Sequence, residues 1–231
     1  DFGKLARAVA ADFNRDGNMD VAAANILGGM GLLKGRGDGS FDLSSIPLDM
    51  PLTSWSMDIA LGDFNNDGNI DIAAASGQSV QLLAGQGDAD FTFSSLPVIE
   101  STVSIALNFS DILTLRAADF NKDGNLDLVA GGAVFLGDGN GGLSLLHSLC
   151  RDCGLPLVGD FNQDGNSDIV VRFSTQTQAG TQYGMKTFMN LGDGAFFGLP
   201  EKMPSAGTNP LGSLTGPLAD LNMDGLGDLA Y

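Results

Sequence analysis

The chain is poor in several residue types on which common functions depend. It has one histidine, two cysteines, one tryptophan, and 11 lysines and arginines against 28 acidic residues. A lone histidine, His147, leaves no serine–histidine–aspartate triad with independent support. With so few lysines and arginines, the chain lacks the positively charged surface that binds the phosphates of nucleic acids, so nucleic acid is not an expected partner. No apolar run approaches the roughly 18 residues of a membrane helix, so membrane insertion is not expected.

Glutamate is almost as scarce as tryptophan. Only Glu100 and Glu201 are glutamates among the 28 acidic residues, and the formal charge is −17. A generic solvated surface would use both acids, so something selects the shorter carboxylate. The 43% hydrophobic content argues against a disordered acidic chain, and 231 residues are enough for one large domain.

What the chain has instead is a nine-residue pattern, D-x-N-x-D-G-x-x-D, in five copies. Their first aspartates are 51, 56, 41 and 60 residues apart, and the variation falls in Ser, Gly and Pro-rich stretches. We call the copies the first to fifth loops. They are residues 12–20 (DFNRDGNMD), 63–71 (DFNNDGNID), 119–127 (DFNKDGNLD), 160–168 (DFNQDGNSD) and 220–228 (DLNMDGLGD).

A second element follows each of the first four loops: an apolar run enters a Gly, Asp or Asn turn and leaves on an aromatic residue or Leu. These turns lie before Phe41, Phe91, Leu143 and Phe196, and they predict β-hairpins. Each unit is therefore expected to hold a strand, the acidic loop, a second strand and a hairpin. The second strand is Ala-rich, as at 72–75, so we place it where strands converge around a central axis. Helix should be scarce.

The paired loop and G-D-G-x-F turn resemble FG-GAP or VCBS-type repeats, the units of integrin-α-like and secreted microbial propellers. The resemblance implies an all-β fold: a β-propeller of four-stranded blades of roughly 50 residues, each carrying a calcium loop. The fifth loop departs from the pattern at Leu221 and at Leu226-Gly227. The expected single propeller segment has approximate repeats at 1–50, 51–105, 106–150, 151–205 and, in part, 206–231.

The loop pattern matches the needs of Ca²⁺, which takes six to eight oxygen ligands. Positions 1, 3, 5 and 9 offer side-chain oxygens, and Gly at position 6 permits the turn that brings the position 7 carbonyl inward. Five ions would reduce the formal charge from −17 to −7. The alternative is a set of Asx turns without metal, and Mg²⁺ is disfavoured by its tight octahedron. The expected ligands are Asp12, Asn14, Asp16, Asn18, Asp20, Asp63, Asn65, Asp67, Asn69, Asp71, Asp119, Asn121, Asp123, Asn125, Asp127, Asp160, Asn162, Asp164, Asn166, Asp168, Asp220, Asn222, Asp224, Leu226 and Asp228.

Four weaker signals carry alternatives. Cys150 and Cys153 predict a local disulfide between two strands. The alternatives are a redox motif, which needs a βαβ setting, and a partial zinc site, which needs a fourth ligand; the sequence indicates neither. Arg36-Gly37-Asp38 spells an adhesion tripeptide, but equivalent turns also carry Gly-Asp, so a turn role is favoured. Asn108 begins a glycosylation sequon. Trp55 either stacks on a sugar or packs between blades.

These observations favour a non-enzymatic, calcium-stabilised binding or scaffold module, located outside the cell or on its surface. Its partner would be a protein or glycan on a cell surface or in the matrix, as in adhesion or surface assembly. A lectin-like propeller is the alternative, as is the non-catalytic part of a secreted polysaccharide-active enzyme. Fold alone does not choose among them.

The ring of blades is expected to be incomplete. Only Leu229-Ala230-Tyr231 follow the fifth loop, and four residues precede the first strand of the first unit. The segment would then hold four blades and part of a fifth. Further blades of a parent polypeptide, or a second chain, would cover the open edge.

Overall fold

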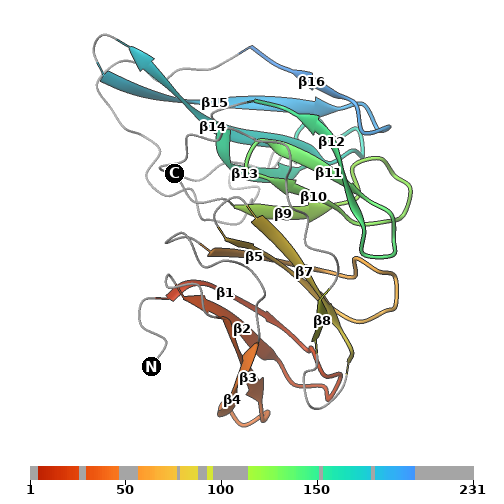
Figure 1. Cartoon of the computed structure of the whole chain (residues 1–231). Helices are drawn as coiled ribbons and strands as arrows, with labels where there is room; N and C mark the ends of the chain where they lie inside the picture. The colour runs from red at the N-terminus through yellow and green to blue at the C-terminus, as the bar shows by residue number, and fades with distance from the viewer. Residues whose placement is uncertain are drawn as a thin grey trace.

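The computed structural model contains strands and no helix in the residues that it describes (Figure 1). The prediction of an all-β chain is therefore confirmed for this part of the molecule. The fifth loop and the rest of the expected fifth unit lie outside it. The described residues are 5–25, 30–46, 57–76, 79–87, 93–95, 114–150, 153–177 and 180–200.

The strands form four antiparallel sheets of four, and within each sheet the strands follow one another in chain order. Each sheet lies inside one of the first four expected repeats. The first sheet holds β1 (Leu5–Ala11), β2 (Asp20–Asn25), β3 (Met30–Gly35) and β4 (Phe41–Ile46). The second holds β5 (Met57–Gly62), β6 (Asp71–Ser76), β7 (Ser79–Gly85) and β8 (Phe93–Ser95). The third holds β9 (Leu115–Ala118), β10 (Asp127–Ala130), β11 (Ala133–Gly137) and β12 (Leu143–Ser148). The fourth holds β13 (Cys153–Gly159), β14 (Asp168–Thr177), β15 (Gly180–Asn190) and β16 (Phe196–Gly198).

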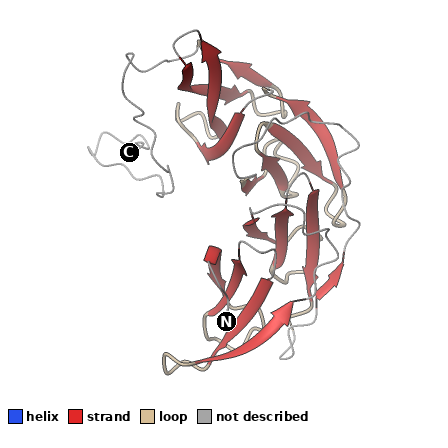
Figure 2. Cartoon of the chain, turned by 60° about the vertical axis from the view of Figure 1, so that its left-hand side comes forward, coloured by secondary structure: helices blue, strands red, loops and turns tan. Residues whose placement is uncertain are grey.

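The sheets follow one another in an arc (Figure 2). The first strand of each sheet contacts the first strand of the next, from β1 through β5 and β9 to β13. These first strands thus lie where the sheets converge, and the Ala-rich strands β2 and β6 lie one place further out. Our placement of the Ala-rich strands at the line of convergence is wrong.

The side chains of β6 are small for a different reason: both faces of this strand are buried. In β6, Ile72 and Ala74 belong to the core against the first sheet. Ala73 and Ala75 belong to the core against the third sheet. Successive side chains of a strand point to opposite faces, so an inner sheet of a stack has no solvent face. Small side chains let both neighbouring sheets approach.

The expected hairpin turns are present between β3 and β4, between β11 and β12, and between β15 and β16. A backbone hydrogen bond closes each turn: the amides of Arg36, Asp138 and Leu191 donate to carbonyls four residues later, at 3.1, 3.0 and 2.9 Å. Glycines of these turns have positive φ, for example 76° at Gly37 and 88° at Gly39. That backbone conformation favours glycine, which explains the G-x-G and G-D-G spelling.

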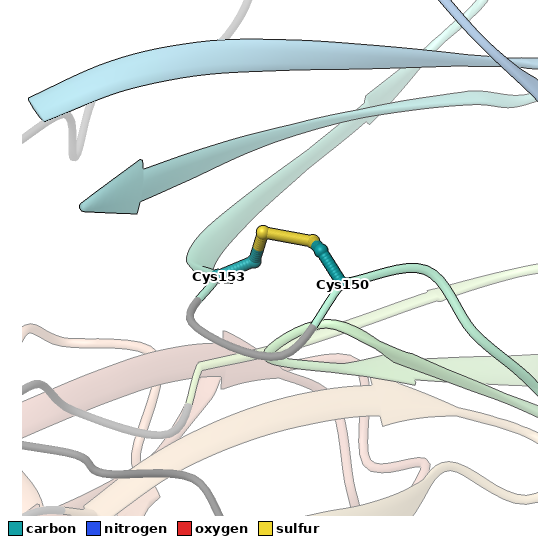
Figure 3. Close-up of a disulfide and its surroundings, with 2 residues drawn as sticks. All are labelled: Cys150 and Cys153. Atoms are coloured by element: carbon teal, nitrogen blue, oxygen red, sulfur yellow. A yellow bond between two sulfur atoms is a disulfide. The ribbon is translucent and has the colours of Figure 1, made fainter. Parts of the chain in front are cut away.

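A disulfide joins Cys150 to Cys153, as predicted (Figure 3). Cys150 follows β12, and Cys153 is the first residue of β13 and is buried. The bond therefore pins the short connection between the third and fourth sheets. Both cysteines pack in the core between those sheets.

An ion network around the buried Asp58, which the sequence patterns did not indicate, links the first strands of three sheets. Asp58 of β5 has a 4% exposed side chain, and its carboxylate lies 3.2 Å from Nε of Arg7 in β1 and 3.3 Å from Nη1 of Arg116 in β9. The amide of Leu115 also donates to Asp58 at 2.9 Å. The loss of hydration lowers the pKa of Arg116, an effect that Asp58 opposes. Asp58 therefore connects three sheets through charge.

Candidate metal-binding loops

The first four loops each connect the first strand of a sheet to its second strand, and they lie at the same end of the four sheets (Figure 1). Strand pairing brings the two ends of each loop together: Ala11 pairs with Asp20, and Gly62 with Asp71. Position 9 of each loop is thus already the first residue of the second strand. The fold delivers four acidic loops side by side.

Within each loop, side-chain oxygens turn inward onto backbone amides. In the first loop, Asp12 accepts hydrogen bonds from the amides of Asp16 at 3.1 Å and Gly17 at 2.8 Å. Asn14 Oδ1 accepts from the same Asp16 amide at 3.0 Å, and Asp16 Oδ1 accepts from the amide of Asn18 at 2.8 Å. Side-chain oxygens of positions 1 and 3 therefore both accept from the amide of position 5, and the position 5 carboxylate accepts in turn from the amide of position 7.

The second, third and fourth loops repeat this pattern. The amide at position 5 donates to position 1 at 3.1, 3.2 and 3.1 Å, in the order of the loops. The amide at position 6 donates to position 1 at 2.8, 2.9 and 2.8 Å. The sequence repeat is thus a repeat of atomic geometry.

Two positions of each loop hold a left-handed backbone. Glycine at position 6 has φ between 81° and 88° in all four loops, which confirms the expected sharp turn. Position 4, for which the motif fixes no residue type, also has positive φ although it is never glycine. The values are 58°, 56°, 59° and 61° for Arg15, Asn66, Lys122 and Gln163. The residue type at position 4 varies among the loops, so the sequence indicates this backbone conformation only through the Asp-Gly that always follows it.

The aspartate at position 9 is fully buried in all four loops and ties the loop to the rest of its sheet. In the third loop, Asp127 Oδ2 accepts from the Phe120 amide at 2.7 Å, and Oδ1 accepts from the Gly137 amide at 2.9 Å. Gly137 ends β11, so this one carboxylate joins the loop to the third strand. Asp20, Asp71 and Asp168 accept the equivalent pairs of amides.

Burial also changes the acidity of position 9. The pKa of Asp71 is raised to about 6, first by loss of hydration and then by the charges of Asp67 and Asp63, against hydrogen bonds from Gly85 and Phe64 that lower it. The pKa values of Asp127 and Asp168 are raised for the same reasons, with burial the largest. The position 9 carboxylate thus feels the charges at positions 1 and 5, as neighbours in a metal site would.

The side chain at position 7 packs under the hairpin of its own sheet, which sequence reasoning missed. A Cβ on Gly37, Gly87 or Gly139 would overlap Oδ1 of Asn18, Asn69 or Asn125, respectively. Oδ1 of Asn69 and of Asn166 is buried without a hydrogen-bond partner. The Asn of the loop and the Gly of the turn occur together in four units, and this joint repetition could have predicted the contact between them.

The donor chemistry of these loops fits a hard cation. All expected donors are oxygens, and those of positions 1 and 3 accept from the same amide. Among the described residues, no group of three or more Asp, Glu, His or Cys side chains gathers closely enough to form a metal centre by itself. Position 9 directs both oxygens to amides, although each oxygen keeps a second lone pair for a cation. Asn side chains and the position 7 carbonyl would complete the set. Calcium ligation therefore stays a prediction, and the fifth loop lies outside the described residues.

The weaker candidate sites have plain structural settings. Arg36 Nε donates to Asp42 Oδ2 at 2.8 Å, and Asp38 accepts from the Ser40 amide at 2.9 Å, so the adhesion-like tripeptide forms part of its own turn. His147 lies exposed on β12. Trp55 and Asn108 lie outside the described residues. In the described part of the chain, no helix is long and apolar enough to cross a membrane.

Comparison with known families identifies the repeat. The model of the FG-GAP-like repeat matches residues 12–74 and 63–130, which together cover more than half of the chain. The chain belongs to the FG-GAP-like repeat family. No curated protein matches it.

Two solved structures resemble this FG-GAP-like chain in fold. One is an Agrocybe aegerita lectin, described for its specific recognition of non-reducing terminal N-acetylglucosamine; the TM-score is 0.50, with 15% identity over 86% of this chain. The other is the V. cholerae biofilm matrix protein Bap1, with a TM-score of 0.52 and 23% identity over 85% of this chain. The matches span 66% of the lectin and 28% of Bap1. At these identities the likeness concerns the fold alone.

Proposed function

We propose that this chain is a calcium-stabilised segment of a β-propeller that serves as an extracellular binding or scaffold module and not as an enzyme. The observation that carries the proposal is the loop geometry, repeated in four sheets with the same inward-facing oxygens. A site present in every unit is a device of the scaffold. Calcium at these loops would be structural, with one ion in each of the five loops.

Each loop concentrates negative charge, which supports the proposal that a cation binds there. Three carboxylates per loop repel one another, and the raised pKa of Asp71 reflects burial first and then the charges of Asp67 and Asp63. A bound divalent cation would offset both costs. Millimolar calcium outside cells would fill even modest sites, which favours an extracellular setting.

The partner is proposed to be a protein or glycan of a cell surface or matrix. The fold likeness to a matrix protein and to a lectin supports a binding or scaffold role. The lectin likeness is also what favours the second candidate, a carbohydrate-binding propeller. Further blades or a second chain would complete the ring in either case.

The test has two parts. Native mass spectrometry in calcium should show one ion per loop, up to five, and the Asp123→Ala variant should lose one. A glycan array and a pull-down from surface extracts, both run with and without chelator, then separate the two candidates. Loops that stay empty at millimolar calcium would refute the calcium proposal. Turnover of a polysaccharide that disappears with Asp123→Ala, while calcium content elsewhere is kept, would refute the non-enzymatic role.

A further inference from the structure

The position 4 side chain of each of the first three loops reaches the loop that follows it. Its left-handed backbone turns it out of its own loop. The Arg15 guanidinium donates to the Gly68 carbonyl in the second loop. Asn66 Nδ2 donates to Asn125 Oδ1 in the third loop at 2.7 Å. The Lys122 ammonium lies 3.9 Å from where a Cβ on Gly165 of the fourth loop would be. Neighbouring loops are therefore in direct contact.

These contacts place a cation beside the position 5 carboxylate of two loops. In the second loop this cation is Arg15, whose guanidinium donates to the carbonyl directly after Asp67. In the fourth loop it is Lys122, whose ammonium lies near Gly165, the residue that follows Asp164. The first loop has its own cation, since Lys34 Nζ lies 3.9 Å from Asp16 Oδ2.

The third loop differs from the other three. Its neighbour at position 4 is the neutral Asn66. A hydrogen bond between the side chains of Asn66 and Asn125 joins these two loops.

A fixed positive charge beside a site lowers its affinity for a divalent cation, because the two charges repel and the carboxylate is partly neutralised already. Exposed single charges interact weakly, but the ion carries two charges, which doubles the repulsion. An effect of about three- to tenfold on the dissociation constant is the expected scale.

We propose that the third loop, residues 119–127, is the tightest calcium site of the first four, and that the position 4 side chain sets the affinity of the loop that follows it. This inference rests on the proposed calcium binding. It gives the repeated sites an order of filling: calcium enters the third loop first and leaves it last. The side chain that controls each site belongs to the preceding sheet.

The test reads each loop separately. The amide resonances of Gly17, Gly68, Gly124 and Gly165, each at position 6 of one loop, are followed in a protein labelled with ¹⁵N-glycine during a titration with buffered calcium. Gly124 should respond at about three- to tenfold lower free calcium than the other three. Added salt should narrow the difference, because it screens exposed charges.

Two substitutions exchange the neighbours. Asn66→Lys should weaken the third loop about three- to tenfold, and Lys122→Asn should strengthen the fourth loop by a similar factor. Asn66→Gln is the matched neutral control and should leave the third loop unchanged in affinity. The backbone tolerates these exchanges, since Asn66 and Lys122 have φ of 56° and 59°. Unchanged circular dichroism spectra check the fold.

The possible outcomes are distinct. If all four glycine signals respond and do so at the same calcium concentration, or if Asn66→Lys leaves Gly124 unchanged, the order of filling is refuted while calcium binding stands. An Asn66→Lys effect that persists undiminished in high salt also refutes it, since the cause is then not charge. If no glycine responds, the proposed function fails and this inference fails with it.

Discussion

At the loop end of the sheets, four sites repeat the same bond: the position 6 amide donates to the position 1 carboxylate at 2.8, 2.8, 2.9 and 2.8 Å. Between the sheets, the three cores are filled differently, with Met30 and Leu32 in one, Val80 and Phe135 in the next, and Val171 and Phe188 in the last. Hydrogen bonds have direction and demand the same residue types, whereas apolar packing asks only for volume and fit. The loops are therefore visible as a repeat and the cores are not.

Removing calcium should disrupt the loop end in all units at once and has the largest expected effect. Ligand at about 100 times its dissociation constant stabilises by about 2.7 kcal/mol per site. Several sites together should then lower the melting temperature by about 10 °C or more on chelation. Differential scanning calorimetry with calcium and with chelator measures this, and magnesium at equal concentration is the control. A melting temperature that ignores chelation would mean that the loops are Asx turns without metal.

Removing a position 9 carboxylate should damage one loop even without calcium. Asp127→Ala leaves the buried amides of Phe120 and Gly137 without their acceptor, at a cost of about 3 kcal/mol in the free energy of unfolding. Asp123→Ala is the matched control, because position 5 is exposed and its loss should matter only when calcium is present. Urea unfolding of both variants in chelator distinguishes them. Equal stability of the two variants there would contradict the tie between loop and strand.

A substitution of Asp58 tests the contacts between the sheets, away from the loops. Asp58→Asn removes the charge that compensates Arg7 and Arg116, and we expect a loss of about 2–3 kcal/mol, moderated because both arginines are partly exposed. The loss should be the same with and without calcium, since the network lies on the first strands and not in the loops. Asp193→Asn, on an exposed turn, is the control. A calcium-dependent loss would show that the two regions are coupled.

Opening the disulfide should have the smallest effect. Cys150 and Cys153 are three residues apart, and closing so short a loop removes little entropy from the unfolded chain. Replacing both with Ser should cost about 1–2 kcal/mol, measured by urea unfolding against the parent under the same oxidising conditions. Cys150→Ser alone should match the double variant. A loss above that of Asp127→Ala would mean that the bond organises the third and fourth sheets together.

Much of the fold followed from residue patterns. The strand–loop–strand–hairpin order, the sharp turn at Gly17 and its equivalents, and the pairing of Cys150 with Cys153 all depend on neighbours in sequence, and the structure has them. The prediction failed for the Ala-rich strands, because a small side chain signals tight packing without saying which neighbour packs against it. The convergence of the first strands is a property of how whole sheets stack.

The sequence by itself determined the loops: which residues offer oxygens, where glycine must turn the backbone, and which family the chain belongs to. Only the tertiary structure decided what each loop has beside it. Arg15, Asn66 and Lys122 occupy the same place in the motif, and nothing in the motif says that each faces the following loop. The physical reason is distance along the chain: motif chemistry acts within nine residues, whereas Asn66 meets Asn125 across 59 residues, through the packing of one sheet on the next.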